Sequence, residues 1–229
     1  FHASRVLPGF EPDSKVKMLL TMKEQAEILR SLGGTHIAFG GNIVDRRKVK
    51  YFDHKDYIVG FVNEAGKILQ DMGLTLCYHP HTGTPIEDRD EIMDFFQRID
   101  PKYVAMAPDI DQIQKGGTDP MLIIKTFEPL IKHIHFKDFG GKLVYDASVL
   151  EVDESESYYN FTEKGKEIDA TGYVNYCVLG DGVVDLKGIL DYFAATARSW
   201  SSLTPALKCR SPRRRPSTGT SCICRRSVI

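Results

Sequence analysis

The chain has 229 residues, of which 42% are hydrophobic and 27% are charged, and its formal net charge is −1 at pH 7. This composition is ordinary for a globular domain, and the length suits one core near the lower end of a single α/β barrel. The near-neutral charge excludes a field that would attract nucleic acid, and apolar runs such as residues 74–78 are too short to span a membrane.

The cysteines and the first five residues indicate the cellular compartment in which we expect the chain. Its five cysteines show no paired spacing before residue 200, and Cys77 and Cys177 lie in apolar runs, as small core residues do. Residues 1–5 show no charged segment followed by an apolar one, so no signal peptide is visible. We therefore expect a reducing, cytoplasmic setting. Because the first residue is Phe1, the chain is expected to begin partway through a longer protein.

Helix-like and strand-like segments alternate along most of the chain. The apolar spacing predicts helices at residues 15–32, 57–72, 87–99, 120–131 and 186–193, and strands at residues 35–39, 74–78, 103–107, 133–136 and 174–179. This alternation indicates βαβ units and a parallel sheet, and about 30 to 40 residues per unit suits a barrel of eight. No G-x-G-x-x-G motif opens these helices, so we predict an α/β fold of the TIM (β/α)8 type rather than an open, doubly wound sheet.

Two segments depart from this alternation. Residues 140–172 are acidic and aromatic, and we predict a long loop over the site. No Asp or Glu follows Asp191, while arginine, serine and proline crowd the end of the chain. We therefore predict a partial barrel domain at residues 1–194 and a basic, disordered segment at residues 195–229. That segment is either a basic arm or the product of a reading frame lost near residue 195. We favour the second because a barrel strand is due there.

Polar side chains follow three successive predicted strands. His79 comes after the strand at residues 74–78, Asp109 after the strand at residues 103–107, and His135 lies in the next strand. The carboxyl ends of barrel strands meet on one face, where active sites are built. Two imidazoles and a carboxylate suit Mn²⁺, Co²⁺, Zn²⁺ or Fe²⁺ better than Ca²⁺. We therefore predict that these three side chains hold one divalent metal.

Simpler roles compete for the same residues. The rings of His79 and His81 would serve equally to bond backbone groups of a turn, and Asp109 to cap the segment after its strand. Lys137 and Asp138 would form a plain ion pair at the rim. The recurrence of such residues at successive strand ends is what favours the metal site.

Four runs of sequence carry a resemblance to a known family. They are LCYHPHTGT at residues 76–84, APDIDQ and KGGTDP at residues 107–120, HIHFKD at residues 133–138 and LGDGVVD at residues 179–185. In order and spacing they resemble the xylose isomerase-like TIM-barrel family of sugar phosphate isomerases and epimerases. Within that family the likeness is greatest to inosose dehydratases.

The resemblance implies a metal held from the fourth, fifth, sixth and eighth strands of the barrel. By position, His79, Asp109 and His135 match the first three ligands, and the eighth-strand Glu has no counterpart. Gln112 takes the place of a histidine that is frequent in the family. The resemblance also implies that two barrel strands are missing before residue 15 and that a normal eighth strand is lacking.

Five further side chains are expected to act beside the metal. His81 and Lys137 are candidates for acid and base work because both should face the cavity, and Gln112, Asp138 and Asp181 are candidates for binding substrate. The resemblance implies removal of a proton next to a carbonyl of a sugar or cyclic polyol, with dehydration favoured over isomerisation or epimerisation.

Other functions remain open at this level. A non-catalytic, truncated barrel is one alternative, and an abasic-site endonuclease is the least favoured because it needs a basic face and more metal ligands. We expect a small-molecule sugar or inositol-derived substrate and neither nucleic acid nor membrane as partner, and homo-oligomer formation stays open.

Overall fold

A four-stranded parallel sheet organises the chain. The computed structural model describes residues 2–3, 12–41, 44, 46, 49–140, 151–152, 161–163, 166–167 and 176–196. The sheet has the order β1-β2-β3-β4, with β1 at His2–Ala3, β2 at His36–Phe39, β3 at Thr75–Tyr78 and β4 at Val104–Met106. Parallel bridges from Met106 to Ile131 and from Asp109 to His135 continue the pairing beyond β4.

The strands are buried because helices cover the sheet. In β2 and β3 the last three residues are buried, and all of β4 is buried, as expected for a parallel sheet that carries crossover helices. Phe39, Tyr78 and Phe95 pack at the centre of the core, with 4.4 Å between the ring centroids of Tyr78 and Phe95. The core lies between the sheet and the helices.

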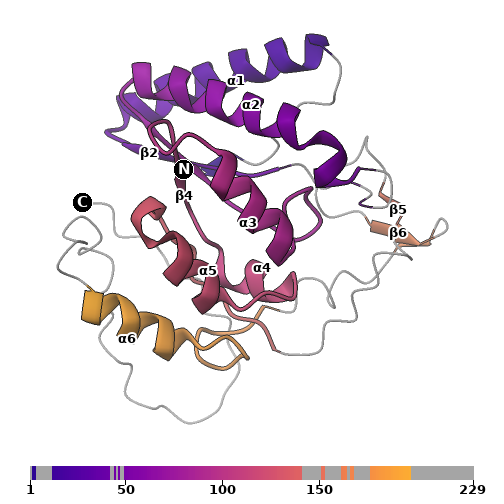
Figure 1. Cartoon of the computed structure of the whole chain (residues 1–229), viewed down its shortest axis with the longest axis vertical. Coiled ribbons are helices and arrows are strands. Elements are labelled where there is room, and N and C mark those ends of the chain that lie inside the picture. Colours follow the sequence, from indigo (N-terminus) through magenta and orange to yellow (C-terminus); the bar gives the residue numbers. More distant parts are fainter. Residues whose placement is uncertain are drawn as a thin grey trace.

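The helices follow the strands in chain order. They are α1 at Pro12–Ser31, α2 at Tyr51–Asp71, α3 at Arg89–Arg98, α4 at Ile110–Lys115, α5 at Pro120–Phe127, the short 3-10 helix η1 at Glu128–Leu130, and α6 at Leu186–Thr196. In Figure 1, α1 and α2 lie side by side, and α6 lies beside α5. In the described part of the chain, no helix is long and apolar enough to cross a membrane.

Helix positions follow from local sequence. The Asp88 carboxylate accepts the backbone N–H of Glu91, whose own side chain accepts N–H bonds in return, a capping box that starts α3. Helix α2 packs closely on the sheet at Gly66, where an added Cβ would lie 2.6 Å from the carbonyl oxygen of Tyr103. A side chain at this position would push α2 off the sheet.

Most predicted elements are confirmed, and some predictions are wrong. No strand was predicted before residue 15, where β1 lies parallel to β2. A two-residue strand has no periodic signal of its own. The predicted strand at residues 133–136 is reduced to one isolated bridge, from His135 to Asp109. The six-residue helix α4 was not predicted. In the predicted strand at residues 174–179, the described part makes an antiparallel bridge from Tyr176 to Phe139.

Much of the predicted loop and nearly all of the predicted basic segment lie outside the described residues, although α6 extends two residues into that segment. In residues 140–172, the described residues include three short antiparallel strands, β5 at Glu151–Val152, β6 at Phe161–Glu163 and β7 at Lys166–Glu167. The rest of that loop beyond residue 140 and residues 197–229 lie outside the described residues.

Candidate metal centre

Backbone pairing brings the three predicted ligands to one end of the sheet. The N–H of His79 donates to the carbonyl of Phe39 at 2.8 Å, which extends β3 by one residue. Asp109 and His135 face each other as a parallel pair, and the N–H of His135 donates to the carbonyl of Pro108 at 3.0 Å. The three side chains therefore leave neighbouring strand ends.

The ligand atoms of His79, Asp109 and His135 lie within 4.8 Å of one another. Oδ2 of Asp109 is 3.4 Å from Nε2 of His79 and 3.5 Å from Nδ1 of His135. Ligands about 2.1 Å from a tetrahedral ion are about 3.4 Å apart. The separations in this cluster therefore fit a shared divalent ion.

Backbone carbonyls orient both histidines of the turn after β3. Nδ1 of His79 lies 3.3 Å from the carbonyl oxygen of Ala107, and Nδ1 of His81 lies 2.8 Å from that of Thr82. A carbonyl can only accept, so Nδ1 donates in both rings and Nε2 carries the lone pair. Burial lowers the pKa of His79 well below its ordinary value and that of His81 to about 4. Both rings are therefore neutral near pH 7.

Asp109 is ionised although it is fully buried. Burial opposes the charge, but the hydrogen bond from His135, the neighbouring His79 ring and the charge of Lys137 outweigh it and hold the pKa of Asp109 well below its ordinary value. The ammonium of Lys137 lies 2.5 Å from Oδ2 of Asp109. Asp109 occupies the N-cap position of α4 but makes no side-chain cap bond. Its carboxylate is thus turned to the cluster, and it does not cap the helix.

A second layer of buried polar side chains lies on α4. Gln112 is 2% exposed. Its Oε1 accepts from the hydroxyl of Thr82, and its Nε2 donates to the hydroxyl of Tyr176 at 2.9 Å and to Asp111 at 3.3 Å. Oδ2 of Asp111 lies 2.8 Å from the ammonium of Lys115. Burial and the neighbouring charge of Asp109 raise the pKa of Asp111 to about 7.

Asp138 is held by backbone groups instead of pairing with Lys137. Its two carboxylate oxygens accept the N–H groups of Phe139, Gly180, Gly182 and Val184 at 2.9 to 3.1 Å. The residue is 1% exposed, so this carboxylate anchors the turn at residues 180–184. Asp181 lies on that turn and is exposed. Contact of either residue with substrate stays a prediction.

The structure therefore brings together six of the eight predicted site residues, as follows. His79, Asp109, His135 and Lys137 share direct contacts; His81 lies beside His79 with ring centroids 5.6 Å apart, and Gln112 joins them through Thr82. Three residues that contact this cluster were not predicted as site residues: Thr82, Lys115 and Tyr176. The four-residue spacing from Asp111 to Lys115 would have suggested an ion pair on a helix, but helix α4 itself was not predicted.

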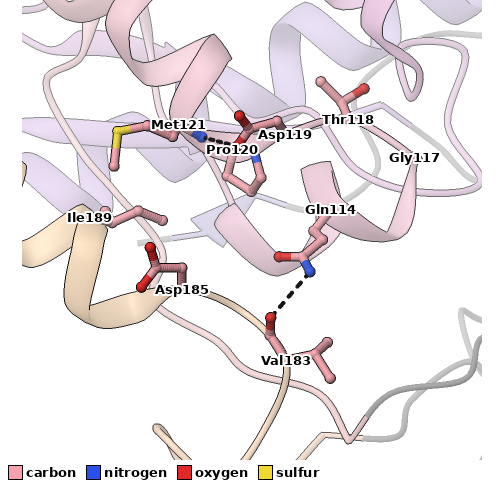
Figure 2. Close-up of a pocket in the computed structure, with 9 residues that line it drawn as sticks. All are labelled: Gln114, Gly117, Thr118, Asp119, Pro120, Met121, Val183, Asp185 and Ile189. Carbon is pink, nitrogen blue, oxygen red and sulfur yellow. Dashed lines mark hydrogen bonds between the residues drawn. The ribbon is translucent and has the colours of Figure 1, made fainter.

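A separate pocket of about 560 Å³ lies where the turn between α4 and α5 faces the start of α6. Figure 2 shows its lining residues, Gln114, Gly117, Thr118, Asp119, Pro120, Met121, Val183, Asp185 and Ile189, with the bond from Gln114 Nε2 to the carbonyl of Val183. None of the eight predicted site residues lines it. The pocket is thus distinct from the candidate metal centre.

Curated proteins with similar sequences are named inosose dehydratase. One from Halalkalibacterium halodurans is 30% identical over 130 residues, which are 57% of this chain and 39% of that protein. Another from Geobacillus thermodenitrificans is 24% identical over 159 residues, which are 69% of this chain and 49% of that protein. The chain thus spans less than half the length of these relatives.

Solved structures agree on the fold. The probable 3-DHS dehydratase AsbF of Bacillus anthracis, involved in petrobactin synthesis, superposes with a TM-score of 0.63 at 14% identity, covering 85% of this chain and 65% of that chain. The IolI protein with a bound zinc atom has a TM-score of 0.63 at 12% identity, covering 85% of this chain and 62% of that chain. The family model described as xylose isomerase-like TIM barrel matches residues 4–208. The chain therefore belongs to the xylose isomerase-like TIM barrel family.

Proposed function

We propose that the chain holds one divalent metal through His79, Asp109 and His135 and acts as a lyase of the inosose dehydratase type. The observation that carries the proposal is the position of Oδ2 of Asp109, 3.4 Å from Nε2 of His79 and 3.5 Å from Nδ1 of His135. The names of the curated relatives support the substrate class, a ketone of a sugar or cyclic polyol.

Two side chains next to the ligands are suited to move protons. A divalent metal bound there supplies Lewis-acid polarisation of the carbonyl oxygen. Nε2 of His81 accepts the proton from the carbon next to that carbonyl. The ammonium of Lys137 gives a proton to the departing hydroxyl group, which leaves as water. Gln112 keeps the turn that carries His81 in place through its bond to Thr82.

An isomerase or epimerase is the second candidate. It would also begin by removing the proton from the carbon next to the carbonyl, and it would then return a proton to carbon. The metal ligands and His81 would therefore have the same roles. An abasic-site endonuclease is less well supported, since the described residues form a single cluster of three or more side chains that could hold a metal. A net charge of −1 also gives no overall field that would attract DNA.

Metal content tests the centre directly. The full chain, stripped with a chelator and reloaded with Mn²⁺, Co²⁺, Zn²⁺ or Fe²⁺, should bind one ion per chain by elemental analysis. His135→Ala should lose that ion, and His54→Ala, altered on α2, should keep it. A wild-type chain that binds none of the four metals would instead support a non-catalytic barrel.

Turnover then tests the reaction. The metal-loaded chain is given an inosose, and loss of water is followed by the absorbance of the unsaturated product. A run in D2O separates the alternatives, because an isomerase or epimerase would place deuterium in an isomeric product that has lost no water. Turnover of neither an inosose nor any keto-sugar would contradict both versions.

A further inference from the structure

A buried lysine has no part in the chemistry proposed above. The side chain of Lys115 is 2% exposed, and its ammonium lies 2.8 Å from Oδ2 of Asp111. The same nitrogen lies 4.0 Å from the ring centroid of Tyr176 and 5.0 Å from that of Phe139. A buried ammonium is costly unless it is paired, and an aromatic face is one of the partners that stabilises it. Lys115 therefore fixes the ring of Tyr176.

Gln112 holds the same tyrosine at its other end. Its Nε2 donates to the Tyr176 hydroxyl at 2.9 Å, and its Oε1 accepts from Thr82, next to His81. The Lys115 ammonium thus contacts the ring of Tyr176, and the Gln112 amide donates to its hydroxyl. These two contacts restrict the side-chain rotamers that an exposed tyrosine ordinarily samples.

Tyr176 is nevertheless 42% exposed. The ammonium of Lys137 lies 5.6 Å from its ring centroid and 2.5 Å from Oδ2 of the fully buried Asp109. Lys137 therefore connects an exposed ring to the buried carboxylate. Tyr176 is therefore exposed to solvent and is linked to the cluster through Lys137 and Gln112.

We propose that Tyr176 is a specificity-determining residue that contacts the substrate, with Lys115 and Gln112 as its positioning residues. The inference rests on the proposed function and names the ligand surface of that same site. A ring that carries hydroxyl groups suits this surface, because its C–H face packs on an aromatic ring while its hydroxyls bond to polar groups around it.

Three substitutions in the full, metal-loaded chain test this role. Binding of myo-inositol is measured by titration calorimetry, and KM and kcat are measured with an inosose. Tyr176→Ala should raise the dissociation constant and KM about tenfold, and Tyr176→Phe about threefold, as expected for losing a ring and a single hydrogen bond. Lys115→Met should raise both about threefold or more. Metal content should stay at the wild-type value in all three.

Tyr192→Phe is the matched control, since the hydroxyl of Tyr192 on α6 bonds to Glu128 of η1, and neither residue belongs to the predicted site. It should leave both constants unchanged. Wild-type constants in Tyr176→Ala would overturn the inference and leave the proposed function intact. Loss of metal from Tyr176→Ala would also overturn it, because the residue would then support the metal centre itself. A wild-type chain that neither binds myo-inositol nor turns over an inosose overturns the proposed function, and this inference with it.

Discussion

The ammonium of Lys137 lies 2.5 Å from Oδ2 of Asp109, the oxygen that also faces His79 and His135. A divalent metal held at this site would therefore compete with the Lys137 ammonium for one carboxylate oxygen. The side chain of Lys137 is 34% exposed, so it has room to move toward solvent.

Lys137→Met should tighten metal binding. Removing the competing cation leaves Asp109 to the metal alone, and a charged hydrogen bond at a partly exposed site corresponds to about a threefold to tenfold change in affinity. Titration calorimetry with Mn²⁺ or Zn²⁺ measures the change. Lys132→Met, altered at an exposed neighbouring position, should bind as wild type does. Weaker binding by Lys137→Met would mean that the lysine supports the site.

Asp109→Asn should abolish metal loading. The amide keeps the size of the carboxylate but removes the negative charge of the one carboxylate ligand in the cluster, so metal affinity should fall by about 100-fold or more. Elemental analysis after reloading measures the loss, and circular dichroism checks the fold. Asp71→Asn, at an exposed position on α2, serves as the matched control. Metal retained by Asp109→Asn would remove Asp109 from the ligand set.

Asp138→Asn should destabilise the turn at residues 180–184. At pH 7 the unfolding free energy should fall by about 2 to 4 kcal/mol, because an amide nitrogen cannot accept the N–H bonds that a carboxylate oxygen accepts. Urea denaturation of both proteins measures this difference. Unchanged stability would mean that solvent replaces the lost bonds.

The same pair of proteins should show an acid dependence. Burial favours the neutral acid, but backbone N–H groups outweigh it and lower the pKa of Asp138. A lowered folded pKa gives stability that is complete above the unfolded value of about 3.9 and is lost as pH falls through the folded pKa. The difference between wild type and Asp138→Asn should therefore shrink below about pH 4. A constant difference down to pH 3 would contradict this account.

Two glycines of α2 should respond in opposite directions. Gly66→Ala places a Cβ 2.6 Å from the carbonyl oxygen of Tyr103, so it should lower the unfolding free energy by about 1 to 3 kcal/mol. At Gly60 an added Cβ meets nothing within 4 Å, so Gly60→Ala should raise it by about 0.5 to 1 kcal/mol. Thermal unfolding measures both. Equal effects would contradict the close packing of α2 on β4.

The sequence by itself determined the alternation of strands and helices and the positions of residues at strand ends. Apolar periodicity and stop signals are local properties, so long helices such as α1, α2 and α3 were predicted to within a few residues except at the start of α2. His79, Asp109 and His135 were predicted to meet because parallel strands carry their carboxyl ends to one face. Short elements such as β1 and α4 were missed because too few residues carry a periodic signal.

Only the tertiary structure decided which partner each polar side chain takes. The sequence left Asp109 equally suited to cap a helix, and Lys137 equally suited to pair with Asp138. In the structure Asp109 makes no cap bond, Lys137 contacts Asp109, and Asp138 accepts backbone N–H groups. The contact between buried Lys115 and Tyr176 likewise depends on the tertiary structure. These choices depend on side-chain direction and on segments far apart in the chain, which spacing along one sequence does not encode.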